Sequence, residues 1–208
     1  FERKYIIDKI SYASDLDFYY DELKNDGWKL IVSDINKIDQ YAHHFNRGAL
    51  IVNFAAESHV DKSFENVSEF IYSNTLGTER VISFCLSNNH RMLHISTDEV
   101  YGEQITNAAD EGQALTPTNP YAATKAAADL FVQTYITCFN LDAKIVRANN
   151  IFGARQLNEK VIPKAIFLAG KDKNFFIHGN KNLRRHFLHT SDFNNALITI
   201  IEHWDNCA

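Results

Sequence analysis

Short apolar runs alternate with longer amphipathic stretches along most of this chain, and this alternation limits the folds open to it. The runs of strand length cover residues 4–8, 28–33, 49–54, 91–96 and 143–147. The stretches with apolar residues at helical spacing cover residues 16–24, 38–46, 65–86 and 121–139. Repeated βαβ units build a parallel sheet with helices on both faces. We predict an α/β fold with a doubly wound parallel sheet.

The pattern changes after Gly153. Residues 159–169 and 192–203 have helical spacing, and residues 175–178 and 186–189 are typical of short strands. We therefore divide the chain into a nucleotide-binding domain over residues 1–153 and part of a smaller substrate-binding lobe over residues 154–208. No proline- or glycine-rich linker separates them, so we expect them to share an interface.

Composition narrows the class of protein and of partner. The 208 residues are 45% hydrophobic and 23% charged, which is ordinary for a folded domain. A net charge of −5 with scattered Lys and Arg argues against nucleic acid and favours a small-molecule partner. No apolar run approaches the roughly 20 residues that span a bilayer.

Cysteine and histidine usage predicts neither a disulfide framework nor a metal site. Cys85, Cys138 and Cys207 are odd in number and form no CxxC pair, and the nine histidines show no ligand spacing. Unpaired thiols suit a reducing compartment, so we predict a cytoplasmic protein.

Tyr121 and Lys125 lie four residues apart, which places both side chains on one face of a helix. A tyrosine with a pKa near ~10 is a poor base at neutral pH unless positive charge stabilises its phenolate. Lys125 and an oxidised nicotinamide could supply that charge. Taken alone, the pair also fits an exposed helix start.

Asp98 and Glu99 follow Ser96 and Thr97 at the end of a predicted strand, where ligands of open α/β sheets bind. Elimination of water needs one group to take a proton from carbon and another to protonate the leaving hydroxyl. Two adjacent carboxyls could divide that work; the alternative is that they cap a strand-to-loop turn.

Asp8 closes the first predicted strand. An acid there can accept hydrogen bonds from the adenosine ribose and repel the extra phosphate of NADP, which favours NAD. The glycine-rich phosphate loop expected ~20 residues before such an acid does not occur in the chain. Because the chain also opens at Phe1 without an initiator Met, we expect it to be an internal fragment; a degenerate relative is the alternative.

Four segments occur in a recognisable order: NFAAESHVD (residues 53–61), STDEVYG (96–102), NPYAATK (119–125) and RANNIFG (147–153). Over nearly its whole length the chain resembles the nucleoside diphosphate glucose 4,6-dehydratases, which are extended short-chain dehydrogenases/reductases. The resemblance implies a Rossmann-like fold, bound NAD and a nucleotide-sugar substrate.

The resemblance also implies roles for individual residues. The catalytic set would be Thr97, Asp98, Glu99, Tyr121 and Lys125, with Thr97 bonded to the substrate alcohol. The residues that would hold NAD are Asp8, Lys9, Ile10, Ser11, Asp34, Ile35, Phe54, Ala55, Ala56, Ser73, Tyr121, Lys125 and Asn150. Those that would hold the sugar nucleotide are Glu57, Ser58, Thr97, Asn149, Lys160, Val161, Phe176, Ile177, His178 and Arg185. The planar fork of Arg185 suits a diphosphate, whereas His178 departs from the Tyr that is commoner in the family.

The implied reaction converts dTDP- or UDP-glucose into a 4-keto-6-deoxy sugar, as in rhamnose and other deoxysugar biosynthesis. Tyr121 would take the proton of the 4-hydroxyl while NAD takes a hydride from carbon 4. Glu99 would then remove the carbon 5 proton, Asp98 would protonate the departing 6-hydroxyl, and the hydride would return to carbon 6. Family members also suggest a homodimer through the helices at residues 65–86 and 121–139.

Two other functions compete with this interpretation. A sugar-nucleotide 4-epimerase of the same superfamily shares the Tyr/Lys pair but needs no acid and base after Thr97. A non-catalytic relative that binds nucleotide sugars would account for the absent glycine-rich loop.

Overall fold

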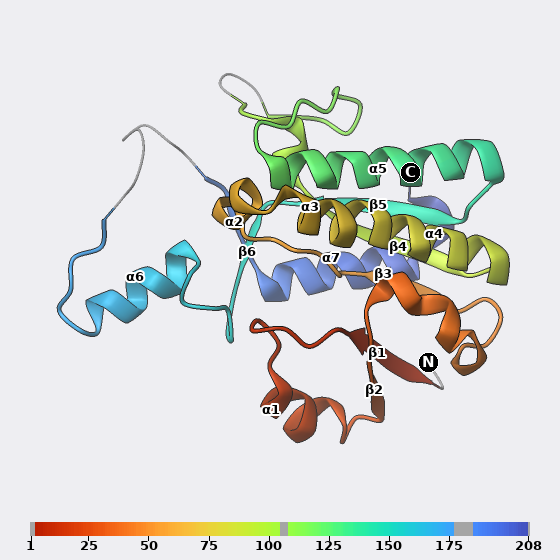
Figure 1. Ribbon diagram of the computed structural model, residues 1–208, viewed down its shortest axis with the longest axis horizontal. Helices are drawn as coiled ribbons and strands as arrows, with labels where there is room; N and C mark the ends of the chain where they lie inside the picture. Colours follow the sequence, from red (N-terminus) through yellow and green to blue (C-terminus); the bar gives the residue numbers. More distant parts are fainter. Residues whose placement is uncertain (1–2, 105–107, 177–184, 208) are drawn as a thin grey trace. The chain divides into compact units, whose positions relative to one another are not determined.

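The computed structural model describes residues 3–104, 108–176 and 185–207. The chain forms two compact units, Phe1–Arg147 and Ala148–Ala208. Figure 1 shows the helices and strands of each unit along the chain.

Parallel strand pairs form the framework of the first unit. Strand β1 (Lys4–Asp8) pairs in parallel with β2 (Trp28–Val32), with Lys4 opposite Trp28. A second sheet has the order β3 (Leu50–Asn53), β4 (Arg91–Thr97), β5 (Ala143–Ala148), and β3 runs parallel to β4. The predicted α/β class with parallel strands is confirmed. Within the described residues the two sheets share no ladder, so the predicted sheet is present as two pieces.

Two helices cover the three-stranded sheet. Helix α4 (Gly77–Asn88) and helix α5 (Pro120–Phe139) contact each other and pack on β4 (Figure 1). The core between these elements is apolar and fully buried; it contains Ile38, Val81, Ile82, Phe84, Cys85, Met92, Val132, Leu141 and Ala143. Strand β4 is buried along almost its whole length, as expected for a central parallel strand. This packing fixes the end of β4 against the start of α5.

The helix predicted over residues 65–86 is largely confirmed by a continuous helical run from Val67 to Asn88, but it begins after Asn66 and contains a π-helical segment. The structure has α2 (Val60–Glu65), α3 (Val67–Phe70), a π-helical turn (Ile71–Leu76) and then α4. The break falls at Asn66, whose backbone leaves the helical region at φ −140° and ψ 70° and whose side chain accepts a hydrogen bond from Glu69 N. Asparagine competes with the helix backbone in this way and therefore starts a new helix.

The two shorter helices near the start differ from the α-helices predicted. Residues 16–24 form one turn of α1 (Leu16–Phe18) followed by a π-helical segment (Tyr19–Leu23). The region predicted at 38–46 is a 3₁₀ helix (Ile35–His44) that begins earlier. Asp34 caps it by accepting a 2.8 Å hydrogen bond from Asn36 N.

The second unit combines two strands and two helices. Strand β6 (Asn150–Phe152) pairs in parallel with β7 (Phe187–His189), and the helices are α6 (Val161–Ala169) and α7 (Thr190–Glu202). Strand β6 was not predicted, because three residues are too few for a periodic pattern. The strand predicted at 175–178 is absent at its described residues 175 and 176, and residues 177 and 178 lie outside the description.

A short 3₁₀ helix, Trp204–Asn206, follows α7. Among the described residues, no helix combines the length and the apolar character needed to cross a bilayer.

Candidate active site

The first component of the site is the turn that follows β4. The strand ends at Thr97, and a 3₁₀ turn (Asp98–Tyr101) leads to Gly102. Gly102 has φ +73°, and a Cβ there would lie 2.2 Å from the carbonyl oxygen of Thr116. Only glycine tolerates both that conformation and that close approach. The turn therefore holds Asp98 and Glu99 at the carboxyl end of the buried strand.

The second component is the first turn of α5. Asn119 caps the helix by accepting a 2.8 Å hydrogen bond from Ala122 N, and Pro120 takes the first helical position, where its missing N–H costs nothing. Tyr121 and Lys125 then lie one turn apart on the buried face, with 9% and 3% of their surface exposed. The exposed helix start considered from the sequence is therefore wrong.

Tyr121 is held from three sides. Its backbone N–H donates to Ser63 Oγ at 3.2 Å, and its ring meets that of Phe70 edge to face at 6.4 Å between centroids. Burial raises the pKa of Tyr121 above its ordinary value, and the negative charges of Glu99 and Asp98 add to that rise. A hydrogen bond with the Thr97 hydroxyl acts in the opposite direction. The protein groups together keep Tyr121 protonated at neutral pH.

Lys125 contacts the backbone of β4. Its ammonium Nζ donates a 2.7 Å hydrogen bond to Ile95 O. Burial lowers the pKa of Lys125 to about 8, and the nearby negative charge of Asp129 limits the fall. Lys125 is therefore still charged at neutral pH. Its hydrogen bond is to the strand, and the supply of positive charge to the Tyr121 phenolate by Lys125 remains a prediction.

Asp98 and Glu99 are half-buried and belong to the same turn. Thr97 Oγ1 donates to Asp98 Oδ1 and accepts from Glu99 N, each at 3.3 Å. Glu99 Oε2 also accepts a 2.9 Å hydrogen bond from Asn119 Nδ2. The two carboxyls are therefore fixed by Thr97 and Asn119 at the end of β4, near enough to Tyr121 for their negative charges to raise its pKa.

The predicted cofactor segment forms a tight loop after β1. Asp8 Oδ1 accepts hydrogen bonds from Ile10 N at 2.6 Å and from Ser14 Oγ at 3.1 Å. Ile10 has φ +54°, an uncommon conformation for a β-branched residue that the Asp8 carboxylate supports. Ser11 lies within this loop, and Asp34 and Ile35 begin the 3₁₀ helix after β2.

The loop after β3 connects the predicted cofactor and substrate residues. Glu57 forms an ion pair with Lys9 of the β1 loop. The backbone N–H of Glu57 donates to Asn74 Oδ1, and the backbone carbonyl of Glu57 accepts from Asn74 Nδ2. Asn74 Nδ2 also donates to Thr124 Oγ1 at 3.0 Å, next to Lys125. The neighbours Phe54, Ala55, Ala56 and Ser58 lie in the same loop, and Ser73 lies buried on the π-helical turn.

The remaining predicted residues belong to the second unit. Asn150 Nδ2 donates to His186 O at 3.3 Å, and Asn149 is exposed just before β6. Lys160 and Val161 begin α6. Phe176 and Arg185 are exposed, whereas Ile177 and His178 lie outside the described residues. Contact of these residues with substrate remains a prediction.

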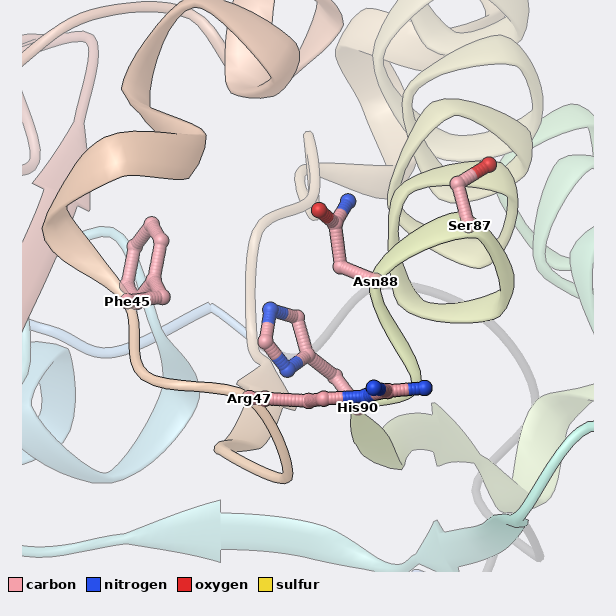
Figure 2. A pocket seen from close by; sticks show the side chains of 5 residues that line it. All are labelled: Phe45, Arg47, Ser87, Asn88 and His90. Carbon is pink, nitrogen blue, oxygen red and sulfur yellow. The ribbon is translucent and has the colours of Figure 1, made fainter.

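A separate hollow of about 320 Å³ lies at the other end of β4, lined by Phe45, Arg47, Ser87, Asn88 and His90 (Figure 2). His90 precedes the first residue of the strand and accepts a 3.2 Å hydrogen bond from Ala49 N, while its ring packs on Phe84. These contacts give His90 a structural role. Ligands of parallel sheets bind at the carboxyl ends of strands, so the hollow is not the candidate site.

The family assignment comes from a sequence profile described as the NAD dependent epimerase/dehydratase family, which matches residues 10–207. The chain belongs to this family.

Two relatives and one solved structure illustrate the similarity. A dTDP-D-glucose 4,6-dehydratase of Mus musculus is 34% identical, covering 94% of this chain and 56% of its own length. A second relative, 37% identical, is RHM2 of Arabidopsis thaliana, a trifunctional UDP-glucose 4,6-dehydratase/UDP-4-keto-6-deoxy-D-glucose 3,5-epimerase/UDP-4-keto-L-rhamnose-reductase. The match covers 94% of this chain and 30% of RHM2. The Streptomyces venezuelae dTDP-glucose 4,6-dehydratase DesIV, solved with NAD and TYD, superposes with a TM-score of 0.90 at 30% identity, covering 96% and 62%. The chain thus spans less than two thirds of each protein.

The Rossmann-like fold and the resemblance to 4,6-dehydratases are confirmed by these matches. The hydrogen-bond acceptors present also suit the adenosine half of NAD. An ionised carboxylate offers about four acceptor positions, and the loop bonds to Asp8 use two of them, which leaves capacity for ribose hydroxyls.

Three functional candidates were missed from the sequence. Asn119 could have been found as an asparagine before a proline at a helix start, the usual N-cap signal. Asp129 could have been found by continuing the spacing of four from Tyr121 through Lys125. Asn74 carries no local signal, because its partners Glu57 and Thr124 lie 17 and 50 residues away.

Proposed function

We propose that the full-length protein is a nucleoside diphosphate glucose 4,6-dehydratase that acts on dTDP- or UDP-glucose. The observation that carries the proposal is the pair of carboxyls, Asp98 and Glu99, on a turn beside Tyr121. A 4-epimerase needs the tyrosine and lysine but has no step that uses an acid and a base on carbons 5 and 6. The names of the relatives agree with the dehydratase.

Tyr121 takes the proton of the 4-hydroxyl, and Thr97 orients that hydroxyl and the phenol by hydrogen bonding. NAD, when bound, would accept the hydrogen of carbon 4 with its electron pair and return it to carbon 6. The pKa of Tyr121 is raised by burial and by Glu99, so positive charge from the bound nicotinamide and from Lys125 is needed to lower it. Proton removal by Tyr121 is therefore coupled to cofactor binding.

The 4-keto group formed in this way acidifies the proton on carbon 5. Glu99 removes that proton while Asp98 protonates the 6-hydroxyl, which leaves as water. When carbon 6 receives the hydride, the protonated Glu99 returns a proton to carbon 5, which completes the 4-keto-6-deoxy sugar. Asn119 holds the Glu99 carboxylate through Nδ2, so the base keeps one orientation while the acid acts. The two carboxyls must therefore hold opposite protonation states at the elimination step.

The family resemblance supports an assignment of the ligand-binding residues. Residues at the ends of β1, β2 and β3, together with Ser73 and Asn150, would hold NAD. Glu57, Ser58 and Thr97 would contact the sugar, and Asn149, Lys160, Val161, Phe176, Ile177, His178 and Arg185 would hold the nucleoside diphosphate.

We also propose that the full-length protein is a homodimer. The outer face of α5 exposes large apolar side chains at Leu130, Phe131 and Phe139, and α4 exposes Leu86. Burial of these side chains against a second copy would remove apolar surface from water. Sedimentation of the full-length protein tests this, and a monomer at micromolar concentration contradicts it.

A cytoplasmic location completes the proposal. Its support is the state of two cysteines: Cys85 is buried, Cys138 is exposed, and both are free thiols. Free thiols persist most readily in a reducing compartment. Imaging of the tagged full-length protein tests this location.

The direct experiment offers dTDP-glucose and UDP-glucose in turn to the full-length protein with NAD and identifies the products by NMR. We expect a 4-keto-6-deoxy sugar nucleotide from one or both. Formation of the 4-epimer supports the epimerase instead, and binding without conversion supports the non-catalytic relative.

A further inference from the structure

Asp129 is a fully buried carboxylate to which the proposed reaction assigns no role. It lies on α5, four residues after Lys125, so the two side chains share one face of the helix. Its Oδ2 accepts a 2.8 Å hydrogen bond from Arg147 Nε on β5. Its Oδ1 lies 3.5 Å from His94 Nε2 on β4. The carboxylate therefore joins α5 to both neighbouring strands.

His94 contributes no positive charge to this cluster. Its Nδ1 lies 3.3 Å from the Asn53 amide nitrogen, which can only donate, so Nδ1 is the acceptor and Nε2 carries the hydrogen. Burial lowers the pKa of His94 and favours this neutral ring. The hydrogen on Nε2 then faces Asp129 Oδ1.

Asp129 offsets part of the positive charge in this region. Arg147 on β5 and Lys125 on α5 are cations, and Asp129 on α5 is an anion whose charge acts on both. Other ionisable groups around the cluster include Tyr121 on α5, and Tyr101, Asp98 and Glu99 on the turn after β4. Removal of Asp129 would leave both cations without this carboxylate, and the group that can lose its proton most readily is Lys125.

The two oxygens of Asp129 are bonded unequally. Oδ2 has the short bond to Arg147, whereas the contact of Oδ1 with His94 Nε2 is 3.5 Å, long for a hydrogen bond, and Ser96 Oγ is buried nearby. A buried ion pair is often no better for stability than apolar packing. The stability of the fold alone therefore gives little reason for a carboxylate at this position, which favours a role of its charge in the site.

Arg147 connects the same carboxylate to the turn after β4. Its Nη1 donates to the Tyr101 hydroxyl at 2.7 Å, and its guanidinium lies 5.0 Å from the Tyr101 ring centroid. Tyr101 closes the turn that begins with Asp98 and Glu99. Asp129 is thus linked to both halves of the candidate active site.

We propose that Asp129 is a positioning residue whose buried negative charge keeps Lys125 protonated against the Ile95 carbonyl. The use of that charge in the reaction rests on the proposed function. The charge itself is a property of the folded protein and can be measured without any substrate.

The experiment titrates lysine side chains labelled with ¹³C at Cε in the full-length protein by NMR. The Lys125 signal is the one missing from Lys125→Arg. In the wild type it should titrate near pH 8, well below ordinary lysines. In Asp129→Asn the midpoint should fall by at least about one unit, because an opposite charge of this kind shifts a pKa by about 1–3 units. An unchanged midpoint in the folded variant overturns the proposal.

Asp142→Asn is the matched control. It removes a carboxylate of equal charge that is exposed and pairs with Arg91. It should leave the Lys125 midpoint unchanged, and Asp129→Glu should bring the midpoint back toward wild type.

If Asp129→Asn does not fold, Arg147→Gln is compared with the double variant Asp129→Asn/Arg147→Gln, in which no guanidinium is left without its carboxylate. The double variant should have the lower midpoint, and equal midpoints contradict the proposal.

A second readout joins the charge to catalysis. The pH at which activity is lost on the alkaline side should move down in Asp129→Asn by the same amount as the Lys125 midpoint. A moved midpoint with an unmoved activity profile overturns the positioning role. If the wild-type protein converts neither sugar nucleotide, the proposed function fails, while the lysine titration still decides whether Asp129 sets the charge.

Discussion

Tyr121 is the residue on which the proposed chemistry depends most. Tyr121→Phe keeps the buried ring and its contact with Phe70, and it leaves the backbone bond to Ser63 in place. It removes the hydroxyl that exchanges the proton. We expect kcat to fall by about 10²–10⁴-fold, the usual contribution of a positioned acid or base, with unchanged circular dichroism. A loss of less than tenfold would contradict its assignment.

Substitution can distinguish the role of the two carboxyls in elimination from the role of Tyr121 in oxidation. Asp98→Asn with Glu99→Gln preserves size and hydrogen-bonding capacity but removes the acid and the base. We expect oxidation at carbon 4 to persist in a single turnover, followed by the absorbance of the reduced cofactor, while deoxy sugar formation stops. Deoxy sugar formed at the wild-type rate would show that neither carboxyl acts in the elimination.

At the scale of single elements, the cap of α5 has a structural and a chemical role that can be told apart. Asn119→Ser keeps an oxygen that can cap Ala122 N but is too short to reach Glu99 as the amide does. We expect its free energy of unfolding to stay near wild type while the dehydration rate falls. Asn119→Ala should lose about 1 kcal/mol of stability as well. Equal dehydration rates in wild type and Asn119→Ser would remove Glu99 orientation from the mechanism.

The turn after β4 needs glycine at position 102 because of both its positive φ and the close approach of Thr116. Gly102→Ala would force a Cβ to within 2.2 Å of Thr116 O at a positive φ, so we expect a loss of about 3 kcal/mol and a displaced Asp98–Glu99 turn. Gly27→Ala is the control, since Gly27 has φ +83° with nothing within 4 Å of the added carbon. It should lose only about 1–2 kcal/mol and keep activity. Denaturant unfolding of both variants checks the difference, and equal losses contradict it.

Elements with strong local signals could be predicted, and elements set by distant contacts could not. The five strands of the first unit were placed to within one residue at each end, because short apolar runs bounded by polar residues mark strands clearly. The break at Asn66 and the π-helical turn at Ile71–Leu76 depend on side-chain bonds and packing that a helical period does not record. The same distinction applies to the site. Thr97, Tyr121 and Lys125 lie in local motifs, whereas the Asp129 cluster joins residues on α5, β4 and β5.

At the scale of the whole molecule, the candidate catalytic residues lie around the carboxyl end of a central parallel strand, β4. The first unit contains the buried tyrosine, the lysine and both carboxyls, while the residues proposed to hold the nucleoside diphosphate belong to the second. Since the chain spans 56% of the mouse relative and 62% of the DesIV chain, experiments on activity belong on the full-length protein.

The path of one hydrogen atom distinguishes a dehydratase from an epimerase most directly. Full-length protein with NAD is given dTDP-glucose or UDP-glucose that carries deuterium at carbon 4, and the product is analysed by NMR and mass spectrometry. We expect the deuterium at carbon 6 of a 4-keto-6-deoxy sugar, because the hydrogen taken from carbon 4 is returned to the carbon that loses its hydroxyl. Deuterium that returns to carbon 4, with the 6-hydroxyl retained, would contradict the proposed function.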